Sequence, residues 1–365
     1  VTQNQQLGIN ASEIKSARMN AKTANDIPKT GLFAENEDLR PTDHNGILKI
    51  GISQSIAWPG LYAARKNYLQ EQLKYAELNT AVVQAAIKRD VRATYYQLWY
   101  FQDKQLLLSG LDSIYANLFK ATELRVRTGD VPKLDQIAAA ARMKELQALI
   151  EQNRKDMLVQ QQQLMVLLNQ NEWLLPMSAP LEKVQFSLEG STVPHPLIGL
   201  QQQKVQVAGA NVSVQRNANR PEFSGRVFSQ RLWGAPDPFT GFSVTASFPV
   251  FGISANRHRV KAAAAELEVQ EKTLNYQEQT LNRQRQSALT EIEKNSALLS
   301  FYETSGLQQA EEIIKAATLS YKAGEISFAE LGQFLGQAIG IRQNYLEVLN
   351  TYNQSAIQFN YFNQQ

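Results

Sequence analysis

The chain contains two copies of one structural unit, and this duplication limits its possible folds more than any other feature. Three landmarks recur at matched places: Gly129 and Gly324, Gly60 and Gly252, and Pro28 and Pro221. Their offsets are 195, 192 and 193 residues, so the copies stay in register apart from small insertions. A period this long that occurs only twice indicates a duplicated unit rather than a solenoid.

Each copy carries one predicted strand pair, at 30–57 in the first copy and at 221–250 in the second. Apolar residues alternate with polar ones in both pairs, at Leu48, Ile50, Ile52 and Ile56 and at Phe242, Val244, Ala246 and Phe248. This period-two pattern indicates strands with one apolar face. An ordinary half-buried strand pair in a soluble domain would give the same alternation. However, isolated pairs are marginal in water, and four strands cannot close a barrel. The pattern therefore favours a membrane β-barrel to which several copies of the chain contribute strands.

Helices far longer than those of globular domains are expected after each strand pair. No proline interrupts 60–127 or 252–322, and an unbroken helix of that length spans about 100 Å. Apolar residues recur in heptads, with Thr80 and Thr94 as polar seam positions, which indicates coiled-coil packing. Each long helix should end at a glycine that takes the left-handed conformation. A returning helix follows, and Pro132 suits a first helical turn.

These elements predict two structural repeats, each formed by a helix, a strand hairpin and a helical hairpin. The first repeat spans 1–170, with its helical hairpin at 60–170. The second spans 195–365, with its helical hairpin at 253–362. Between them, 171–194 is rich in proline and lacks a helical period, so it reads as an irregular connector. Val1 aligns with about Pro194, where the second copy begins. We therefore expect either that a leader has been removed or that the chain is a piece of something longer.

Composition excludes several classes of function. The chain has no cysteine, which rules out disulfides, thiol catalysis and thiolate metal sites. A formal charge of +3 on 365 residues gives little support for a nucleic-acid partner. His44, His195 and His258 have no metal-binding spacing, and no catalytic motif is present. We therefore expect no catalytic residue, no resident metal and no cofactor.

Acidic residues follow both predicted helix turns at matched places: Asp130 with Glu325, and Asp135 with Glu330. Acids near a helix N-terminus complement the helix dipole, and this explanation suits Asp130 and Glu325. Asp135 and Glu330 lie further along the helices. If several chains surround an axis, each of these two would form a ring of like charge of the kind found in cation-selective constrictions. The dipole and ring interpretations both remain open for them.

The paired motifs resemble the TolC-type outer-membrane factors, most closely the CzcC and CusC branch that serves heavy-metal efflux pumps. The resemblance covers about 10–362. It rests on the tip pattern from Tyr321 and Gly324 to Glu330, repeated at the same distance from two strand hairpins. It implies a mainly α fold with a β-barrel part: long coiled-coil hairpins, four transmembrane strands per chain, and a trimeric α/β barrel of twelve strands.

The resemblance also implies a function. The chain would be a passive exit duct in the outer membrane of a Gram-negative bacterium, extending into the periplasm as a homotrimer embedded in outer-membrane lipid. It would conduct heavy-metal cations or drugs from the periplasm, together with a periplasmic adaptor and an inner-membrane pump of the resistance-nodulation-division type. The adaptor would dock at the tips, which comprise Arg127, Thr128, Gly129, Asp130, Val131, Tyr321, Lys322, Ala323, Gly324, Glu325 and Ile326.

By position, Glu330 matches the first acid of the family's entrance constriction. The second acid is replaced by Gln333, and Asp135 is a third candidate for the constriction. Two rival functions remain, a periplasmic coiled-coil adaptor and a structural trimeric scaffold without a channel. An adaptor should flank a single helical hairpin with lipoyl-like segments, and a scaffold would leave the strands at 242–248 unexplained.

Overall fold

A computed structural model describes residues 3–37, 46–176, 180–189, 194–232, 239–249 and 252–364. Its helices are α1 (Gln5–Lys22), α2 (Pro59–Arg127), α3 (Lys133–Leu168), α4 (Pro196–Asn217), α5 (Ile253–Phe301), α6 (Leu307–Ala323) and α7 (Phe328–Asn363). Its strands are β1 (Gly31–Glu37), β2 (Ile47–Ile56), β3 (Glu222–Leu232) and β4 (Phe239–Ser247). The expected loops at 38–45 and 233–238, and with them His44, lie outside the described residues. The prediction of a mainly helical chain with a small antiparallel sheet is confirmed.

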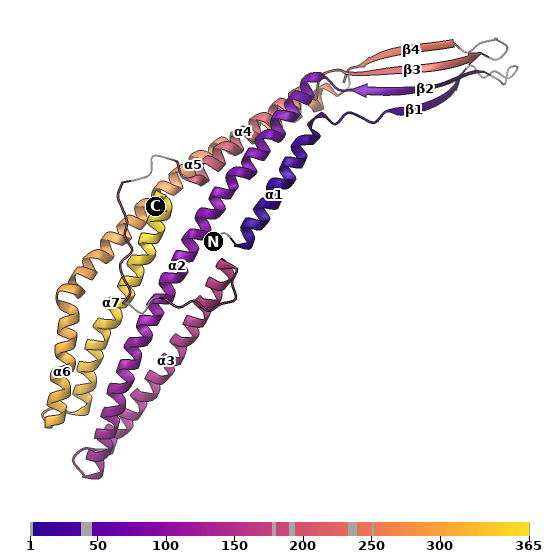
Figure 1. The fold of residues 1–365 in the computed structure, drawn as a ribbon. Coiled ribbons are helices and arrows are strands. Elements are labelled where there is room, and N and C mark those ends of the chain that lie inside the picture. The colour runs from indigo at the N-terminus through magenta and orange to yellow at the C-terminus, as the bar shows by residue number, and fades with distance from the viewer. Residues whose placement is uncertain are drawn as a thin grey trace. The chain divides into compact units, whose positions relative to one another are not determined.

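The two strand hairpins join into one antiparallel sheet in the order β1-β2-β3-β4 (Figure 1). The sequence predicted each hairpin but not the pairing of β2 with β3, which runs from Ile47 opposite Leu232 to Ile56 opposite Phe223. The register places the predicted apolar residues on one face, because Ile52 lies opposite Val227 and Val227 lies opposite Phe242. That face is bare: Leu32 is 85% exposed and Phe242 is 80% exposed.

The opposite face of the sheet is mostly polar, and it has a row in which phenylalanine and glycine alternate across all four strands. Phe33 pairs with Gly51, Gly51 with Phe228, and Phe228 with Gly241. A Cβ at Gly51 would lie 2.8 Å from Phe33 Cζ, and one at Gly241 would lie 2.7 Å from Phe228 Cζ. The aromatic rings therefore cover the two glycines, an arrangement that fixes strand register.

Four charged residues on the same polar face form two ion pairs. Arg226 Nη1 lies 2.9 Å from Glu35 Oε1, and Lys49 Nζ lies 2.5 Å from Glu37 Oε2. The two cations also lie over aromatic rings, Arg226 at 4.9 Å from the centroid of Phe33 and Lys49 at 5.7 Å from that of Phe228. These four charges are thus balanced and held in place.

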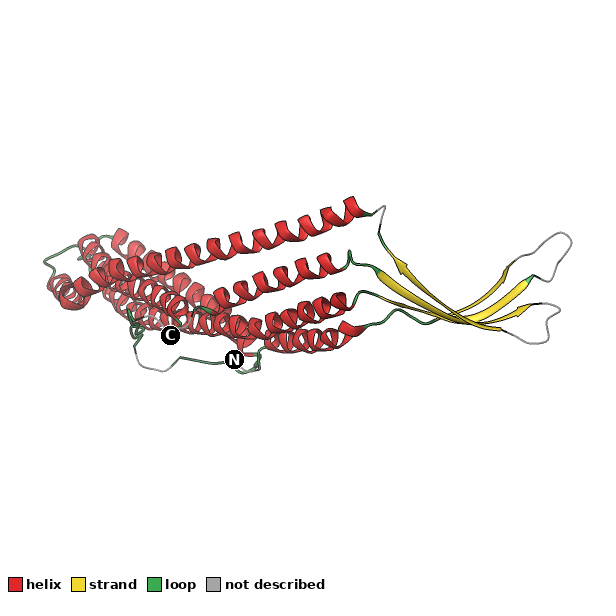
Figure 2. Cartoon of the chain, turned by 90° about the horizontal axis from the view of Figure 1, so that it is seen from above, coloured by secondary structure: helices red, strands yellow, loops and turns green. Residues whose placement is uncertain are grey.

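The chain forms two compact units, and both repeats contribute to each of them. One unit comprises 8–82 and 196–278, and it contains the sheet with α4 and parts of α1, α2 and α5. In Figure 2 these four helices run side by side toward the sheet. The polar seam residue Thr80 has a partner there, because Asn10 Nδ2 of α1 donates to its Oγ1 at 2.5 Å. A buried amide of α1 therefore explains the break in the heptad.

The other unit comprises 1–7, 83–195 and 279–365. Its core contains two apolar clusters, one near the helix turns and one around Trp99, Leu299 and Phe359. In the connector, 180–189 forms no helix or strand and is held on α7 by three asparagines. Asn353 accepts from Val184 N and donates to Glu182 O, Asn360 donates to Gln185 O, and Asn363 donates to Ser187 O.

Within the described residues, no helix is both long enough and apolar enough to cross a membrane.

The second long helix differs from the first. Helix α2 is continuous over 69 residues, whereas a π-helical segment, Tyr302–Gly306, separates α5 from α6. The repeat offset grows from 192 at Gly252 to 195 at Gly324, so the second copy holds three extra residues in this stretch. A π-helical turn takes up additional residues without ending the helix. The side chains of Thr304 and Ser305 donate to the carbonyls of Ser300 and Phe301 within this wider turn.

Candidate functional site at the two helix turns

Both helix turns at the predicted tip are built in the same way. Gly129 has φ +80° and Gly324 has φ +78°, the left-handed conformation that glycine adopts without strain. At the first turn, Gly129 N donates to Val126 O at 3.2 Å and Asp130 N donates to Arg125 O at 2.8 Å. The second turn repeats these two hydrogen bonds 195 residues later, at 3.1 Å and 2.9 Å. The duplication is therefore preserved in the backbone hydrogen bonds that end α2 and α6.

The helices that follow the two turns begin differently. Ser327 precedes α7 and forms a capping box, in which Glu330 N donates to Ser327 Oγ at 3.2 Å and Ser327 N donates to Glu330 Oε2 at 2.8 Å. The hydrogen bonds from the backbone and hydroxyl of Ser327 hold the pKa of Glu330 below its ordinary value. At the first turn Pro132 takes the capping position, one residue before the helix, and it supplies no side-chain cap. Asp135 lies in the first turn of α3.

Tyr321 joins the two helical hairpins. Its hydroxyl lies 2.9 Å from Thr122 Oγ1 of α2, and its carbonyl accepts from Arg125 Nη1 at 3.2 Å. The Arg125 guanidinium lies 5.1 Å from the centroid of the Tyr321 ring, and Phe328 packs edge-on against the ring at 6.0 Å. Tyr321 is 2% exposed, so its contacts are internal to the chain.

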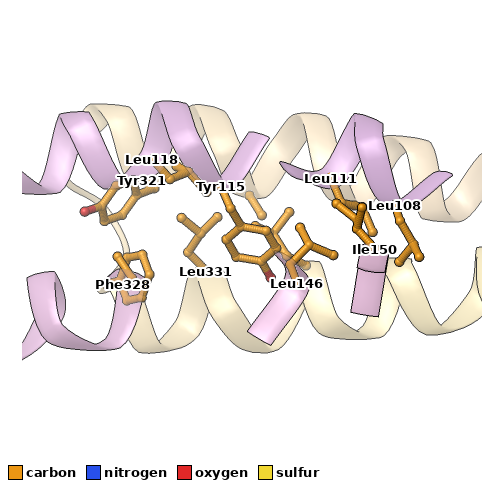
Figure 3. Packing of buried hydrophobic residues seen from close by; sticks show 12 residues of the cluster. Leu108, Leu111, Tyr115, Leu118, Leu146, Ile150, Tyr321, Phe328 and Leu331 are labelled. Carbon is orange, nitrogen blue, oxygen red and sulfur yellow. The ribbon is translucent and has the colours of Figure 1, made fainter. Parts of the chain in front are cut away.

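Figure 3 shows the apolar cluster beneath the turns, to which both hairpins contribute. Leu108, Leu111, Tyr115 and Leu118 come from α2, and Leu146 and Ile150 come from α3. The second hairpin adds Tyr321, Phe328 and Leu331. The cluster packs the two hairpins together below the exposed turns.

Most of the other residues predicted for docking are at the surface. Arg127, Thr128, Gly129, Asp130, Lys322, Ala323, Gly324 and Glu325 are exposed, and Val131 and Ile326 are half-buried. Thr128 Oγ1 donates to Asp130 Oδ2 at 2.9 Å, and Arg127 pairs with Glu123 at 3.3 Å. Gln333 and Glu330 are exposed, whereas Asp135 is half-buried. The turns therefore present backbone, short polar side chains and charged side chains to their surroundings.

A groove beside the turns was missed by the sequence reasoning. It has a volume of about 690 Å³ and lies between α2 and α6. Ile114, Leu124, Ile314 and Leu319 give it apolar walls, and cationic residues also line it: Arg125, Lys315 and Lys322. Leu124 is 63% exposed and Leu319 is 70% exposed. These two leucines occupy equivalent positions in the two repeats. This match in the sequence could have revealed them as an exposed apolar pair.

Nothing in the described part of the chain forms a cluster of three or more His, Cys, Asp or Glu residues suited to a metal ion. His195 is buried, and its ring packs edge-on against Tyr361 at 4.8 Å. Burial lowers the pKa of His195 below its ordinary value, which favours the neutral ring. His195 therefore belongs to the packing of this unit.

Comparison with known proteins agrees with this architecture. Residues 194–360 match the family described as outer membrane efflux protein. The chain carries a domain of that family. It is also similar to the cobalt-zinc-cadmium resistance protein CzcC of Cupriavidus metallidurans, with 21% identity over 95% of this chain and 83% of CzcC.

Solved structures of outer-membrane channels have the same fold as this chain. CusC, solved in a study of transmembrane channel formation, aligns with a TM-score of 0.80 at 15% identity, covering 98% of this chain and 88% of CusC. The outer-membrane channel OprN aligns with a TM-score of 0.83 at 15% identity, covering 98% of this chain and 86% of OprN. The chain therefore has the fold of these channels over nearly its whole length.

Proposed function

We propose that this chain is the outer-membrane exit duct of a tripartite efflux system. The main support for this proposal is the sheet, because one of its faces is apolar and uncovered while the other holds paired charges. A soluble protein rarely leaves such a large contiguous apolar surface uncovered. A strand pattern with apolar residues outward and polar residues inward is that of a membrane barrel with a polar lumen.

Four strands are too few to close such a barrel, which supports a homotrimer. β1 and β4 are the edge strands of the sheet, and unpaired edges favour pairing with another chain. Three copies supply twelve strands if β4 of each copy pairs with β1 of the next. The barrel lies in the lipid of the outer membrane of a Gram-negative bacterium, and the helices extend into the periplasm.

The helix turns are the docking end of the duct for a periplasmic adaptor, which links it to an inner-membrane pump of the resistance-nodulation-division type. The exposed turns at Gly129 and Gly324 and the groove with Leu124 and Leu319 support this role. A partner helix with an apolar stripe and flanking acidic residues would complement the walls and the cations of the groove.

The entrance constriction remains a proposal for Glu330, Gln333 and Asp135. Glu330 is exposed, but one of its oxygens holds the cap of α7. A ring of three such carboxylates would favour cations. With Gln333 in place of a second acid, the ring carries fewer charges.

For the cargo we propose two broad classes rather than one substrate. CzcC is named for resistance to cobalt, zinc and cadmium, so metal cations are one class of cargo that we propose, and drugs are the other. The duct is passive and holds no energy source of its own. The rival functions, an adaptor or a scaffold without a channel, give no reason for a sheet with one bare apolar face.

Two neighbouring residues of β4 test the membrane role of the sheet. Val244 lies on the apolar face and Ser243 on the polar face. Val244→Arg should reduce insertion into lipid vesicles sharply, because arginine at the middle of a membrane strand costs about 2–4 kcal/mol. Ser243→Arg is the matched control and should insert like the wild type. Vesicle flotation measures both, and equal insertion of the two variants would contradict a lipid-facing role for this face.

A further inference from the structure

A band of exposed cations lies where α1, α2, α4 and α5 lead into the sheet (Figure 2). This cationic band comprises the nine lysines and arginines of four segments, 20–30, 57–66, 213–222 and 248–261. All nine are exposed, and no ion pair between described residues involves any of them. Lys66 lies seven residues after the start of α2 and Lys261 lies eight after the start of α5. At about 1.5 Å per residue, the band therefore reaches no more than about 12 Å along these helices.

Positive charge is concentrated in the cationic band. The four segments contain only two carboxylates, Asp26 and Glu222, so the excess is seven positive charges. The formal charge of the whole chain is +3, and the remaining residues together therefore carry −4. The connecting sequences at the other end of the strands, 38–45 and 233–238, contain one arginine and three aspartates. The positive excess thus belongs to the helix end of the sheet.

The cationic band continues directly from the bare apolar face of the sheet. Ile56 and Phe223 of that face lie opposite each other where β2 ends and β3 begins. The Trp58 ring packs on Phe223 at 6.2 Å between centroids, and both side chains are exposed. Arg220 lies three residues before Phe223. Apolar strands, then tryptophan, then long cationic side chains is the order expected across a membrane–water interface.

Both repeats contribute to the cationic band, since Arg257 follows Arg65 at the same offset of 192 residues as the glycines at 60 and 252. Lysine and arginine close to a membrane surface attract anionic lipid headgroups. We propose that the cationic band binds the phosphate headgroups of anionic phospholipids in the leaflet that faces the periplasm. This inference rests on the proposed membrane role of the sheet. It adds a lipid partner and a leaflet to that role.

The lipid selectivity of the full chain in phosphatidylcholine vesicles, with a trace of spin-labelled lipid, tests this inference. Electron paramagnetic resonance separates lipid that is immobilised on the protein from free lipid. At low salt we expect labelled phosphatidylglycerol to be favoured over labelled phosphatidylcholine by about threefold or more. The preference should disappear in sodium chloride of about 1 M, where the Debye length is about 3 Å.

The two proposals fail in different ways in this experiment. Equal immobilisation of the two lipids at low salt would overturn the binding of anionic headgroups but leave the membrane role of the sheet intact. If neither lipid is immobilised, the chain does not contact the bilayer and both proposals are wrong.

A triple variant assigns the selectivity to the cationic band. Arg257→Gln, Arg259→Gln and Lys261→Gln together should reduce the preference for phosphatidylglycerol by about half or more. Immobilised phosphatidylcholine should stay at the wild-type level, which shows that the variant is still folded and inserted. A triple variant that keeps the full preference would overturn the proposal.

The matched control removes the same charge from the other unit. Lys120, Lys144 and Lys155 are exposed, and none of them takes part in an ion pair between described residues. Lys120→Gln, Lys144→Gln and Lys155→Gln together should leave the preference for phosphatidylglycerol unchanged. An equal loss in both triple variants would show that net charge attracts the lipid, and not the cationic band.

Discussion

At the residue scale, Tyr321 is the side chain on which the packing of the two helical hairpins depends most clearly. It is buried, and its hydroxyl meets the hydroxyl of Thr122 across the interface. Thr122 is also fully buried, and its Oγ1 lies within hydrogen-bonding distance of Leu118 O. Two buried hydroxyls that satisfy each other form a contact for which water is a poor substitute.

Removing this hydroxyl should therefore destabilise the hairpin pair. Tyr321→Phe is expected to lower the free energy of unfolding by about 1 kcal/mol, the usual value for one intramolecular hydrogen bond. Urea denaturation followed by circular dichroism measures the change, with Tyr276→Phe as a control at an exposed tyrosine. In a double-mutant cycle with Thr122→Val, the two effects should not add. Strict additivity would show that the hydroxyls do not interact.

Glu330 should make stability depend on pH. Its pKa in the folded chain is lowered by hydrogen bonds from Ser327. Its stabilising effect is therefore fully present above the pKa of an unfolded glutamate, about 4.3, and is lost as the pH falls through the lower folded value. The difference in urea midpoint between the wild type and Glu330→Gln should be largest at neutral pH and should shrink in acid. A difference independent of pH would mean that the carboxylate is not held by the cap.

Sequence reasoning located these residues but could not assign their partners. The tip pattern predicted Tyr321 and Glu330 as functional positions, because spacing from the glycine is a local property of the chain. The partner of Tyr321 is 199 residues away, and no local pattern specifies it. Ser327 lies three residues before Glu330, so the capping box was readable from the sequence as a serine followed by an acid.

At the element scale, the two glycine turns determine where the long helices reverse direction. Alanine at Gly129 or Gly324 should lower the free energy of unfolding by about 1 kcal/mol or more, because an alanine is strained at positive φ. The Cβ itself meets no obstacle, since its nearest contact is 3.8 Å away at Gly324 and none lies within 4 Å at Gly129.

Gly332, inside α7, is a control at which alanine should have the opposite effect on stability. A Cβ there also has open space, and its φ is not positive. Gly332→Ala should therefore raise the free energy of unfolding, by about 0.5–1 kcal/mol. Thermal unfolding of the three variants distinguishes the two signs. A stabilising effect at Gly129 or Gly324 would contradict the conformations assigned to them.

The elements could be predicted from the sequence where their residue pattern is periodic. Features that depend on contacts between residues far apart in the sequence could not. Proline-free heptads and alternating strands gave long helices and two hairpins, since both patterns are periodic over many residues. The pairing of β2 with β3 joins residues more than 160 positions apart, and neither hairpin contains information about the other. The π-helical segment was also missed, although the change in repeat offset from 192 to 195 signalled extra residues there.

At the scale of the whole molecule, the bare apolar face and the open edges of the sheet support the proposal that several copies assemble. Both buried apolar clusters lie in the unit that comprises 1–7, 83–195 and 279–365, whereas the sheet buries little. A trimer that closes a twelve-stranded barrel pairs every edge strand and places the apolar face in lipid. The paired charges on the other face then line a polar lumen.

Single-channel recording of the full chain after reconstitution into a planar lipid bilayer tests whether the chain forms a duct. A duct should give discrete, long-lived conductance steps that are retained by Ser243→Arg and lost with Val244→Arg. Wild-type protein that inserts into the bilayer as a stable assembly but carries no ionic current would contradict the proposal that the chain is a duct.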